Sequence, residues 1–266
     1  MSSDKTGLRS DIAWSTADKI GVHGYDLTEE LMGKVNLGDM AFLEVAGRLP
    51  DANQSRMFNA ILVTLVEHGI VPSTLAARLT HAGAPEAMQA AVAAGLLGLG
   101  SVFVGSTEGS ARMLADAVGG MGQAEALADV ARRVVAEHRA AKRIVPGLGH
   151  PIHKPIDPRT VRLFAIARET GFHGRHVELI DLISKEAEAA TGRSLPVNAT
   201  GAIGALCCEM GFTWKVASGL GVMARAVGLV GHVLEEARAP MAMDIWHRVE
   251  DESSAHSRGK LRSREE

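Results

Sequence analysis

The chain has 266 residues, of which 46% are hydrophobic and 22% charged, so it can bury a sizeable core. Its formal net charge of −3 excludes the strongly basic surface typical of nucleic-acid-binding proteins. The longest apolar run, residues 90–105, is shorter than a membrane span of roughly 18–20 residues. The polar start MSSDKTGLRSDIAW has no apolar signal core, and the only cysteines are the adjacent Cys207 and Cys208. We therefore expect a reduced, soluble, cytoplasmic protein with no nucleic-acid or membrane partner.

The predicted elements are helices. In chain order, the helical stretches cover residues 39–51, 88–105, 122–144, 160–170 and 216–237. Alanine, leucine, glutamate and arginine, which favour helix, fill these stretches, and strand-like alternation is rare. The pattern predicts an all-α fold without internal repeats. We expect an N-terminal arm over residues 1–17, a folded region over 18–249 and a charged, mobile tail over 250–266.

Arg225 lies alone among apolar residues in the stretch 216–237. This stretch is too apolar for a surface helix, which predicts a central core helix. Charged residues are almost never fully buried unless they are paired. Two interpretations stay open: a plain core helix, or a helix whose Arg225 is a buried receptor for a carboxylate, which a guanidinium contacts at two points.

The segment VPGLGHPIHKPIDPRT, residues 145–160, is a stiff loop that contains His150. Gly147 and Gly149 permit backbone conformations closed to other residues, and the prolines fix neighbouring torsions. Histidine suits acid–base catalysis near neutral pH, and Arg159 opens the next predicted helix, where anions bind favourably. The segment is either a rigid connection with surface histidines or a loop that holds an anionic substrate and moves one proton on it.

This loop resembles the glycine-histidine loop of citrate synthases, whose pattern is roughly P-G-x-G-H followed by D-P-R. The resemblance extends over about residues 18–245, through segments that are similar to further motifs of that family. These segments are IGVHGYDLTEEL, MAFLEVAGRLPD, LVEHGIVPSTLAAR, NATGAIGALCCEMGF and MARAVGLVGHVLEE. The short length is more similar to the citryl-CoA lyase branch and to the lyase module of ATP-citrate lyase than to full-length citrate synthases.

The resemblance implies a citrate-synthase-like helical fold, with a large domain and a small domain (about residues 110–215) that close over the active site. The working unit is expected to be a homodimer or a higher homo-oligomer. No metal is implied, and a coenzyme A thioester is expected as a substrate, not as a covalently bound cofactor. The stretch that lies against coenzyme A in the family matches Val145, Pro146, Gly147, Leu148 and Gly149.

Site residues follow from the same resemblance. His150 matches the histidine that protonates the carbonyl of oxaloacetate, or that deprotonates the hydroxyl of citryl-CoA in the reverse direction. Arg159 and Arg225 match arginines that hold substrate carboxylates. His153 is a further candidate for substrate binding, because it lies close to His150 in the sequence.

Two departures concern catalysis. The family uses a histidine in an A-H-G-G segment to stabilise an enol oxygen and an aspartate in an N-V-D segment to remove a methyl proton. Here Glu108, or Thr107 if the alignment slips by one residue, occupies the histidine position, and Thr200 occupies the aspartate position. Glu108 is either a protonated donor or a glutamate at a helix start, and Thr200 is either a donor to the thioester oxygen or a plain cap. Loss of a positioned base typically costs about 10²- to 10⁴-fold in rate.

Three hypotheses follow. The first is a citryl-CoA-lyase-like enzyme that cleaves, or reversibly forms, a C–C bond in a 3-hydroxyacyl-CoA, giving acetyl-CoA and a 2-oxo acid. The second is a catalytically impaired relative that binds coenzyme A and carboxylates, and the third is a helical assembly subunit. The presence of His150, Arg159 and Arg225 favours a ligand site over the third hypothesis.

Overall fold

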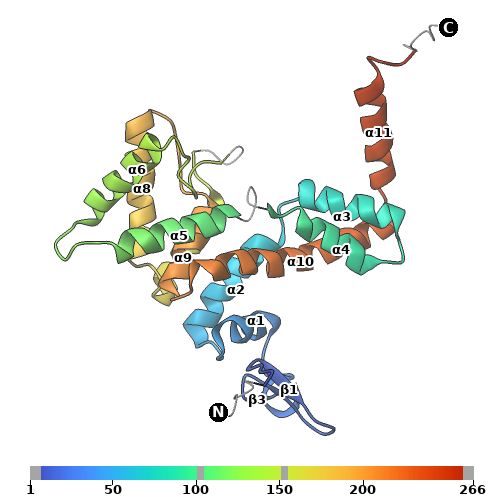
Figure 1. The fold of residues 1–266 in the computed structure, drawn as a ribbon, viewed down its shortest axis with the longest axis horizontal. Coiled ribbons are helices and arrows are strands. Elements are labelled where there is room, and N and C mark those ends of the chain that lie inside the picture. The colour runs from blue at the N-terminus through green and yellow to red at the C-terminus, as the bar shows by residue number, and fades with distance from the viewer. Residues whose placement is uncertain (1–6, 101–104, 151–154, 260–266) are drawn as a thin grey trace, which may run out of the picture. The chain divides into compact units, whose positions relative to one another are not determined.

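The structure, a computed structural model, describes residues 7–100, 105–150 and 155–259 (Figure 1). Near the N-terminus lie three short strands and a π-helical turn: β1 (Ala13–Ser15), β2 (Ile20–Val22), β3 (Tyr25–Asp26) and η1 (Leu27–Leu31). The α-helices that follow are α1 (Leu37–Ala46), α2 (Ala52–Val66), α3 (Pro72–Gly83), α4 (Met88–Leu97), α5 (Gly105–Gly119), α6 (Leu127–Ala140), α7 (Pro158–Thr170), α8 (Arg175–Thr191), α9 (Ala199–Glu209), α10 (Trp214–Arg238) and α11 (Ala242–Ser254). The predicted all-α class is confirmed, with the small sheet as an addition.

The chain divides into two compact units, and each is discontinuous in sequence. Unit 1 consists of residues 1–64 and 104–220, and unit 2 consists of residues 65–103 and 221–266. Helices α2 and α10 contribute residues to both units. The division into an arm, a folded region and a tail stays a prediction; β1 forms within the predicted arm, and α11 continues into the predicted tail.

The small sheet is held against helix α1. Strand β2 pairs antiparallel with both β1 and β3. Val22 on β2, Leu31 on η1 and Leu43 on α1 are buried together and form an apolar cluster. Helix α1 itself is bounded by local signals, because Asn36 caps its first turn and Gly47 ends it in the left-handed conformation with a φ of 69°.

Unit 1 has a core of helices packed around α9. Helix α9 lies beside α5, and it also contacts α7 and α8 (Figure 1). The α5–α9 contact is close, because a Cβ on Gly204 of α9 would lie 2.8 Å from the Ala111 backbone nitrogen of α5. Phe42, Phe58 and Phe212 pack together, with ring centroids 5.2–5.9 Å apart. These contacts fix the first turn of α9, where the candidate site is found.

Unit 2 combines an apolar core with a buried ion pair. Ala77, Ala91, Leu229 and Val233 bring α3, α4 and α10 together. The guanidinium of Arg78, 1% exposed, donates to Glu236 over 2.8 Å.

The carboxylate of Glu236 also accepts hydrogen bonds from the backbone nitrogens of Met241 and Ala242, at the start of α11. Burial by itself raises the pKa of Glu236, but these hydrogen bonds and the Arg78 charge outweigh it and lower the pKa. The buried charge is thus compensated from two sides.

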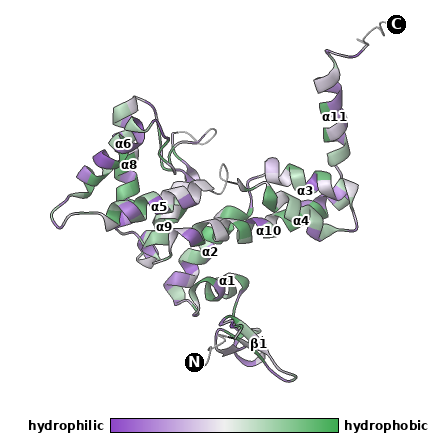
Figure 2. Ribbon diagram, in the orientation of Figure 1, coloured by the Kyte–Doolittle hydropathy of each residue, from purple (hydrophilic) through white to green (hydrophobic). Residues whose placement is uncertain are grey.

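Helix α10 differs from the sequence expectation on membrane spans. It has 25 residues, and within the described part of the chain it alone is long and apolar enough, by length and composition, to cross a membrane. Figure 2 shows hydrophobic residues along this helix. Leu229 and Val233 of α10 are fully buried against α3 and α4, which is the environment of a core helix in a globular fold.

The two cysteines lie on α9 as free thiols, Cys207 buried and Cys208 half-buried. Burial raises the pKa of both thiols, and the neighbouring charge of Glu209 contributes for Cys208, whose pKa rises to about 12. The thiol of Cys208 donates to the carbonyl oxygen of Ala111 on α5 over 3.3 Å. Both residues serve in packing between α5 and α9.

Candidate active site

The first turn of helix α9 is the point at which the predicted site segments of unit 1 meet. Asn198 caps this helix, since its side-chain oxygen accepts a hydrogen bond from the backbone nitrogen of Gly201 over 3.0 Å. The same side chain donates from its amide nitrogen to the carbonyl oxygen of Gly149 over 2.7 Å. A single residue therefore ties the glycine-histidine loop to α9.

The loop itself rests on α9 through two glycines. Gly147 has a φ of +86°, a conformation that favours glycine, and its carbonyl oxygen accepts from the Asn198 backbone nitrogen over 3.0 Å. A Cβ on Gly201 would lie 2.3 Å from that carbonyl oxygen, and a Cβ on Gly147 would lie 2.6 Å from the Gly201 Cα. The backbone of the loop and the first turn of α9 are in direct contact as a result.

His150 directly follows the point where Asn198 holds the loop. It is half-buried, and the backbone nitrogen of the preceding Gly149 donates to the carbonyl oxygen of Pro196 over 2.8 Å. Gly149 also has a positive φ, of 73°, so both glycines that the sequence analysis singled out adopt the special conformation expected of them. His153, predicted to bind substrate, lies outside the described residues.

Arg159 lies in the first turn of α7 and is bound to a carboxylate of its own chain. Its Nε and Nη2 atoms donate to the two oxygens of Asp157 over 3.0 and 2.8 Å, and the backbone nitrogen of Ala199 on α9 donates to the same carboxylate over 3.1 Å. Burial by itself raises the pKa of Asp157, which is completely buried, but the hydrogen bonds and charge of Arg159 outweigh it and lower the pKa. Asp157 is thus an ionised residue that positions Arg159 against α9.

Thr200 lies at the centre of a chain of side-chain hydrogen bonds. Its hydroxyl donates to the side-chain oxygen of Asn198 over 2.7 Å. The hydroxyl of Ser106, at the start of α5, lies 2.9 Å from the Thr200 oxygen. Because the Thr200 proton is used towards Asn198, Ser106 is the donor in this second hydrogen bond. The sequence analysis did not predict Ser106 as a site residue.

Glu108 lies one turn into α5 and is half-buried. The hydroxyl of Ser218, on α10, donates to the Glu108 carboxylate. A carboxylate that accepts from a hydroxyl is in the arrangement of the ionised form, and this geometry supports a structural residue more than a protonated donor. Thr107, the alternative residue at this position, is buried.

Arg225, on α10, belongs to unit 2, whereas the residues above belong to unit 1. Its Nε and Nη1 atoms are buried and have no hydrogen-bond partner among residues 7–100, 105–150 and 155–259. Burial lowers the pKa of Arg225, and the charge of Glu67 acts in the opposite direction. Buried guanidinium donors without acceptors fit the interpretation of Arg225 as a receptor for an anionic ligand.

The arrangement at the start of α9 suits an anion that carries a carbonyl or an enolate. Ser106, Arg159 and Thr200 each lie in the first turn of a helix, where unpaired backbone N–H groups and the helix dipole favour negative charge. Thr200 has hydroxyl and amide neighbours, and the nearby carboxylate of Asp157 is committed to Arg159. The site can bind and polarise an anion, and it offers no carboxylate base at Thr200.

Comparison with known proteins agrees with this geometry. The family model "Citrate synthase, C-terminal domain" matches residues 22–246. The chain is similar to the citryl-CoA lyase of Hydrogenobacter thermophilus, with a TM-score of 0.83 and 32% identity, and the alignment covers 96% of each chain. It is also similar to the ATP citrate lyase of Methanothrix soehngenii, solved with citrate and coenzyme A, with a TM-score of 0.73 and 23% identity over 88% of this chain and 39% of that one.

A curated relative gives the same result from sequence. The probable ATP-citrate synthase of Dictyostelium discoideum is 24% identical over 262 residues, which covers 92% of this chain and 41% of the relative. The chain therefore spans less than half the length of the two ATP-dependent enzymes but nearly the whole of the citryl-CoA lyase. Since the family model covers most of its length, the chain belongs to the citrate synthase family.

Proposed function

We propose that this protein is a carbon–carbon lyase of the citryl-CoA lyase type. It cleaves, or reversibly forms, a C–C bond in a 3-hydroxyacyl-CoA such as citryl-CoA, giving acetyl-CoA and a 2-oxo acid. The observation that carries the proposal is the link made by Asn198, which joins the loop leading into His150 to the hydroxyl pair of Thr200 and Ser106. The likeness to a citryl-CoA lyase over 96% of both chains supports the same reaction.

The chemistry begins at the hydroxyl group of the substrate. His150 takes the proton from the 3-hydroxyl, the new carbonyl forms, and the C–C bond breaks. The bonding electrons move into the thioester, which becomes an enolate, and this enolate takes up one proton from the solvent to become the methyl group of acetyl-CoA. Atoms balance without an oxidant, a reductant or a metal.

The hydroxyl pair stabilises the enolate. Ser106 is the free end of the hydrogen-bond chain, so its O–H can turn from Thr200 to the thioester oxygen while Thr200 keeps its bond to Asn198. A positioned donor at a developing oxyanion typically contributes about 3 kcal/mol to catalysis. Arg159 and Arg225 hold the carboxylates of the acid half of the substrate.

A specific observation favours the alternative that the protein binds coenzyme A and carboxylates with little catalysis. The proton of Thr200 is committed to Asn198, and the nearby carboxylate of Asp157 is committed to Arg159. The acid–base work then falls on His150 alone. A positioned base normally contributes about 10²- to 10⁴-fold in rate, so this arrangement lowers the expected turnover.

The test is a cleavage assay with a panel of 3-hydroxyacyl-CoA thioesters that includes citryl-CoA, with mass detection of acetyl-CoA and the 2-oxo acid. We expect cleavage by the wild type and a loss of about 10²-fold or more in kcat for His150→Ala. His256→Ala is the matched control, since His256 is exposed near the C-terminus. Calorimetric binding of coenzyme A without cleavage of any thioester would support the binding relative instead, and equal cleavage by His150→Ala would remove His150 from the mechanism.

The substrates proposed here are small molecules: an acyl-CoA and a 2-oxo or hydroxy carboxylate. Coenzyme A enters and leaves as part of a substrate, and it lies along the Val145–Gly149 loop. We further propose a cytoplasmic location, which two adjacent reduced thiols fit, and a homodimer or higher homo-oligomer as the working form.

A further inference from the structure

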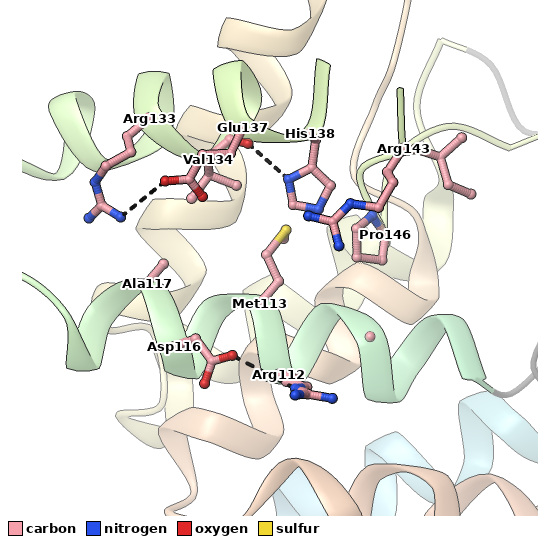
Figure 3. Close-up of a pocket in the computed structure, with 12 residues that line it drawn as sticks. Arg112, Met113, Asp116, Ala117, Arg133, Val134, Glu137, His138, Arg143 and Pro146 are labelled. Carbon is pink, nitrogen blue, oxygen red and sulfur yellow. Dashed lines mark hydrogen bonds and ion pairs between the residues drawn. The ribbon is translucent and has the colours of Figure 1, made fainter. Parts of the chain in front are cut away.

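Unit 1 contains a cavity of about 560 Å³ between helices α5 and α6, separate from the residues described so far (Figure 3). It falls within the size range of small-molecule sites, roughly 300–1,000 Å³. Its lining is mostly polar, and the residues that matter here are Arg112, Met113, Arg133, His138, Arg143 and Pro146. Figure 3 shows His138 and Arg143 next to each other, on the side of the cavity facing Met113 of α5.

The charges of the lining leave one arginine without a partner. Arg112 lies 3.8 Å from Asp116, and Arg133 lies 3.9 Å from Glu137, so the two carboxylates of the lining each face one arginine. Arg133 also lies 3.4 Å from Glu125. Arg143, by contrast, makes no ion pair within residues 7–100, 105–150 and 155–259. The positive charge of the cavity is therefore centred on Arg143.

The backbone places Arg143 beside His138 in a turn that a lysine adopts with difficulty. After α6 the backbone nitrogen of Lys142 donates to the Arg139 carbonyl oxygen, and that of Arg143 donates to the His138 carbonyl oxygen over 2.9 Å. This is the Schellman pattern of helix ends, whose left-handed residue is usually glycine. Here Lys142 takes that conformation, with a φ of 52°. Left-handed residues with a Cβ cost about 1–2 kcal/mol, and they concentrate at functional sites.

His138 completes the polar face of the cavity. Its Nδ1 atom lies 2.8 Å from the carbonyl oxygen of Val134, so Nδ1 carries the proton and donates. The other ring nitrogen, Nε2, can therefore gain a proton and become a second donor close to Arg143. A guanidinium and an imidazolium together are a typical pair for a phosphate group.

The cavity adjoins the loop proposed to bind coenzyme A. Pro146 belongs both to the lining and to that loop, and a Cβ on Gly109 of α5 would lie 3.3 Å from the Pro146 Cβ. A coenzyme A molecule along Val145–Gly149 thus has the cavity at its edge. Coenzyme A carries a phosphomonoester, the 3′-phosphate of its adenosine, with a charge near −2 at neutral pH.

We infer that the α5–α6 cavity binds a phosphomonoester through Arg143 and His138, and that the group comes from the 3′-phosphate of coenzyme A. The choice of coenzyme A as the source rests on the proposed function. A free phosphorylated metabolite has the same chemistry and is the other source that the experiment distinguishes. The Met113 side and the Pro146 side of the cavity give the adjoining nucleoside an apolar contact.

The experiment is calorimetric titration of the full chain with coenzyme A, with dephospho-coenzyme A and with adenosine 3′,5′-bisphosphate. Wild type should bind coenzyme A about tenfold more tightly than dephospho-coenzyme A, the effect of one charge-assisted contact pair. Arg143→Gln should remove this difference and leave the affinity for dephospho-coenzyme A unchanged. Arg139→Gln is the matched control, because Arg139 is exposed on α6 and does not line the cavity.

Each outcome separates the inference from the proposed function. Equal affinity of wild type for coenzyme A and dephospho-coenzyme A overturns the phosphate site and leaves the lyase proposal standing. Binding of the bisphosphate, weakened in Arg143→Gln, without binding of either coenzyme supports the site, assigns it to a free phosphorylated ligand and counts against the lyase. Binding of none of the three overturns both. Thermal unfolding of both variants checks that the exposed substitutions leave the fold intact.

Discussion

Thr200 presents a hydroxyl where the family resemblance leads one to expect a carboxylate. A hydroxyl donates one hydrogen bond and is a very weak base, and here its proton goes to Asn198. The carbon acid of acetyl-CoA is weak and needs a positioned base. A site of this kind handles a substrate whose reactive proton is on oxygen better than one whose reactive proton is on carbon.

We therefore expect slow exchange of deuterium from D₂O into the methyl group of acetyl-CoA, measured by NMR without a second substrate. Thr200→Asp should raise the exchange rate by about tenfold or more, because it restores a base in the first turn of α9, where the helix dipole tolerates an acidic side chain. Thr200→Ser is the control, since it keeps the hydroxyl. Fast exchange in the wild type would show that another residue acts as the base.

At the residue scale, motif spacing could identify His150, Arg159 and Thr200, because their signals are local. It could not identify Ser106, whose partner Thr200 is 94 positions away in the sequence. It likewise missed Asp157 as the carboxylate that holds Arg159 against α9. Such pairings depend on tertiary packing, which the order of residues along one segment does not contain.

At the scale of elements, the contact between the loop and α9 should be sensitive to a single methyl group. In Gly201→Ala the new Cβ would lie 2.3 Å from the Gly147 carbonyl oxygen, so the loop must shift. We expect a loss of about 1–3 kcal/mol in the free energy of unfolding, measured by urea denaturation, together with weaker coenzyme A binding.

Gly219→Ala is the matched control for Gly201→Ala. Gly219 lies within α10, and a Cβ there would meet nothing within 4 Å. Replacing a helical glycine with alanine should stabilise the protein by up to about 1 kcal/mol. A Gly201→Ala variant as stable as wild type would contradict the close contact between the loop and α9.

Element boundaries were predictable where the termination signal is local. The helix predicted over residues 160–170 corresponds to α7, which ends at Thr170 before Gly171 in the left-handed conformation. The stretch 88–105 was predicted as one helix, but α4 ends at Leu97 and α5 starts at Gly105. The three strands were not predicted, because segments of two or three residues are too short to show alternation.

At the scale of the whole molecule, the apolar surface of α10 supports a homo-oligomer. Val227, Val230 and Leu234 follow helical spacing on one face and are 52%, 37% and 56% exposed. An ordered apolar stripe on a long helix is a common feature of subunit interfaces. Discontinuous units, each assembled from two stretches of chain, were not visible in the composition.

We expect light scattering to give at least twice the mass of one chain. Leu234→Lys should shift the protein towards monomer at micromolar concentration, because it places a charge in the apolar stripe. Leu37→Lys is the control, since Leu37 is also exposed but begins α1 in unit 1. A monomeric wild type, or an unchanged mass for Leu234→Lys, would remove this face as the interface.

The packing of the two thiols has a practical consequence for following the enzyme at work. Maleimide dyes react with thiolates, and at neutral pH the raised pKa values keep Cys207 and Cys208 in the protonated form. The chain has no other cysteine. A single cysteine introduced at an exposed position, such as Ser257, would therefore take up one fluorophore without prior removal of the native thiols. The same protein, unmodified elsewhere, could then report ligand binding and subunit exchange by fluorescence anisotropy and energy transfer.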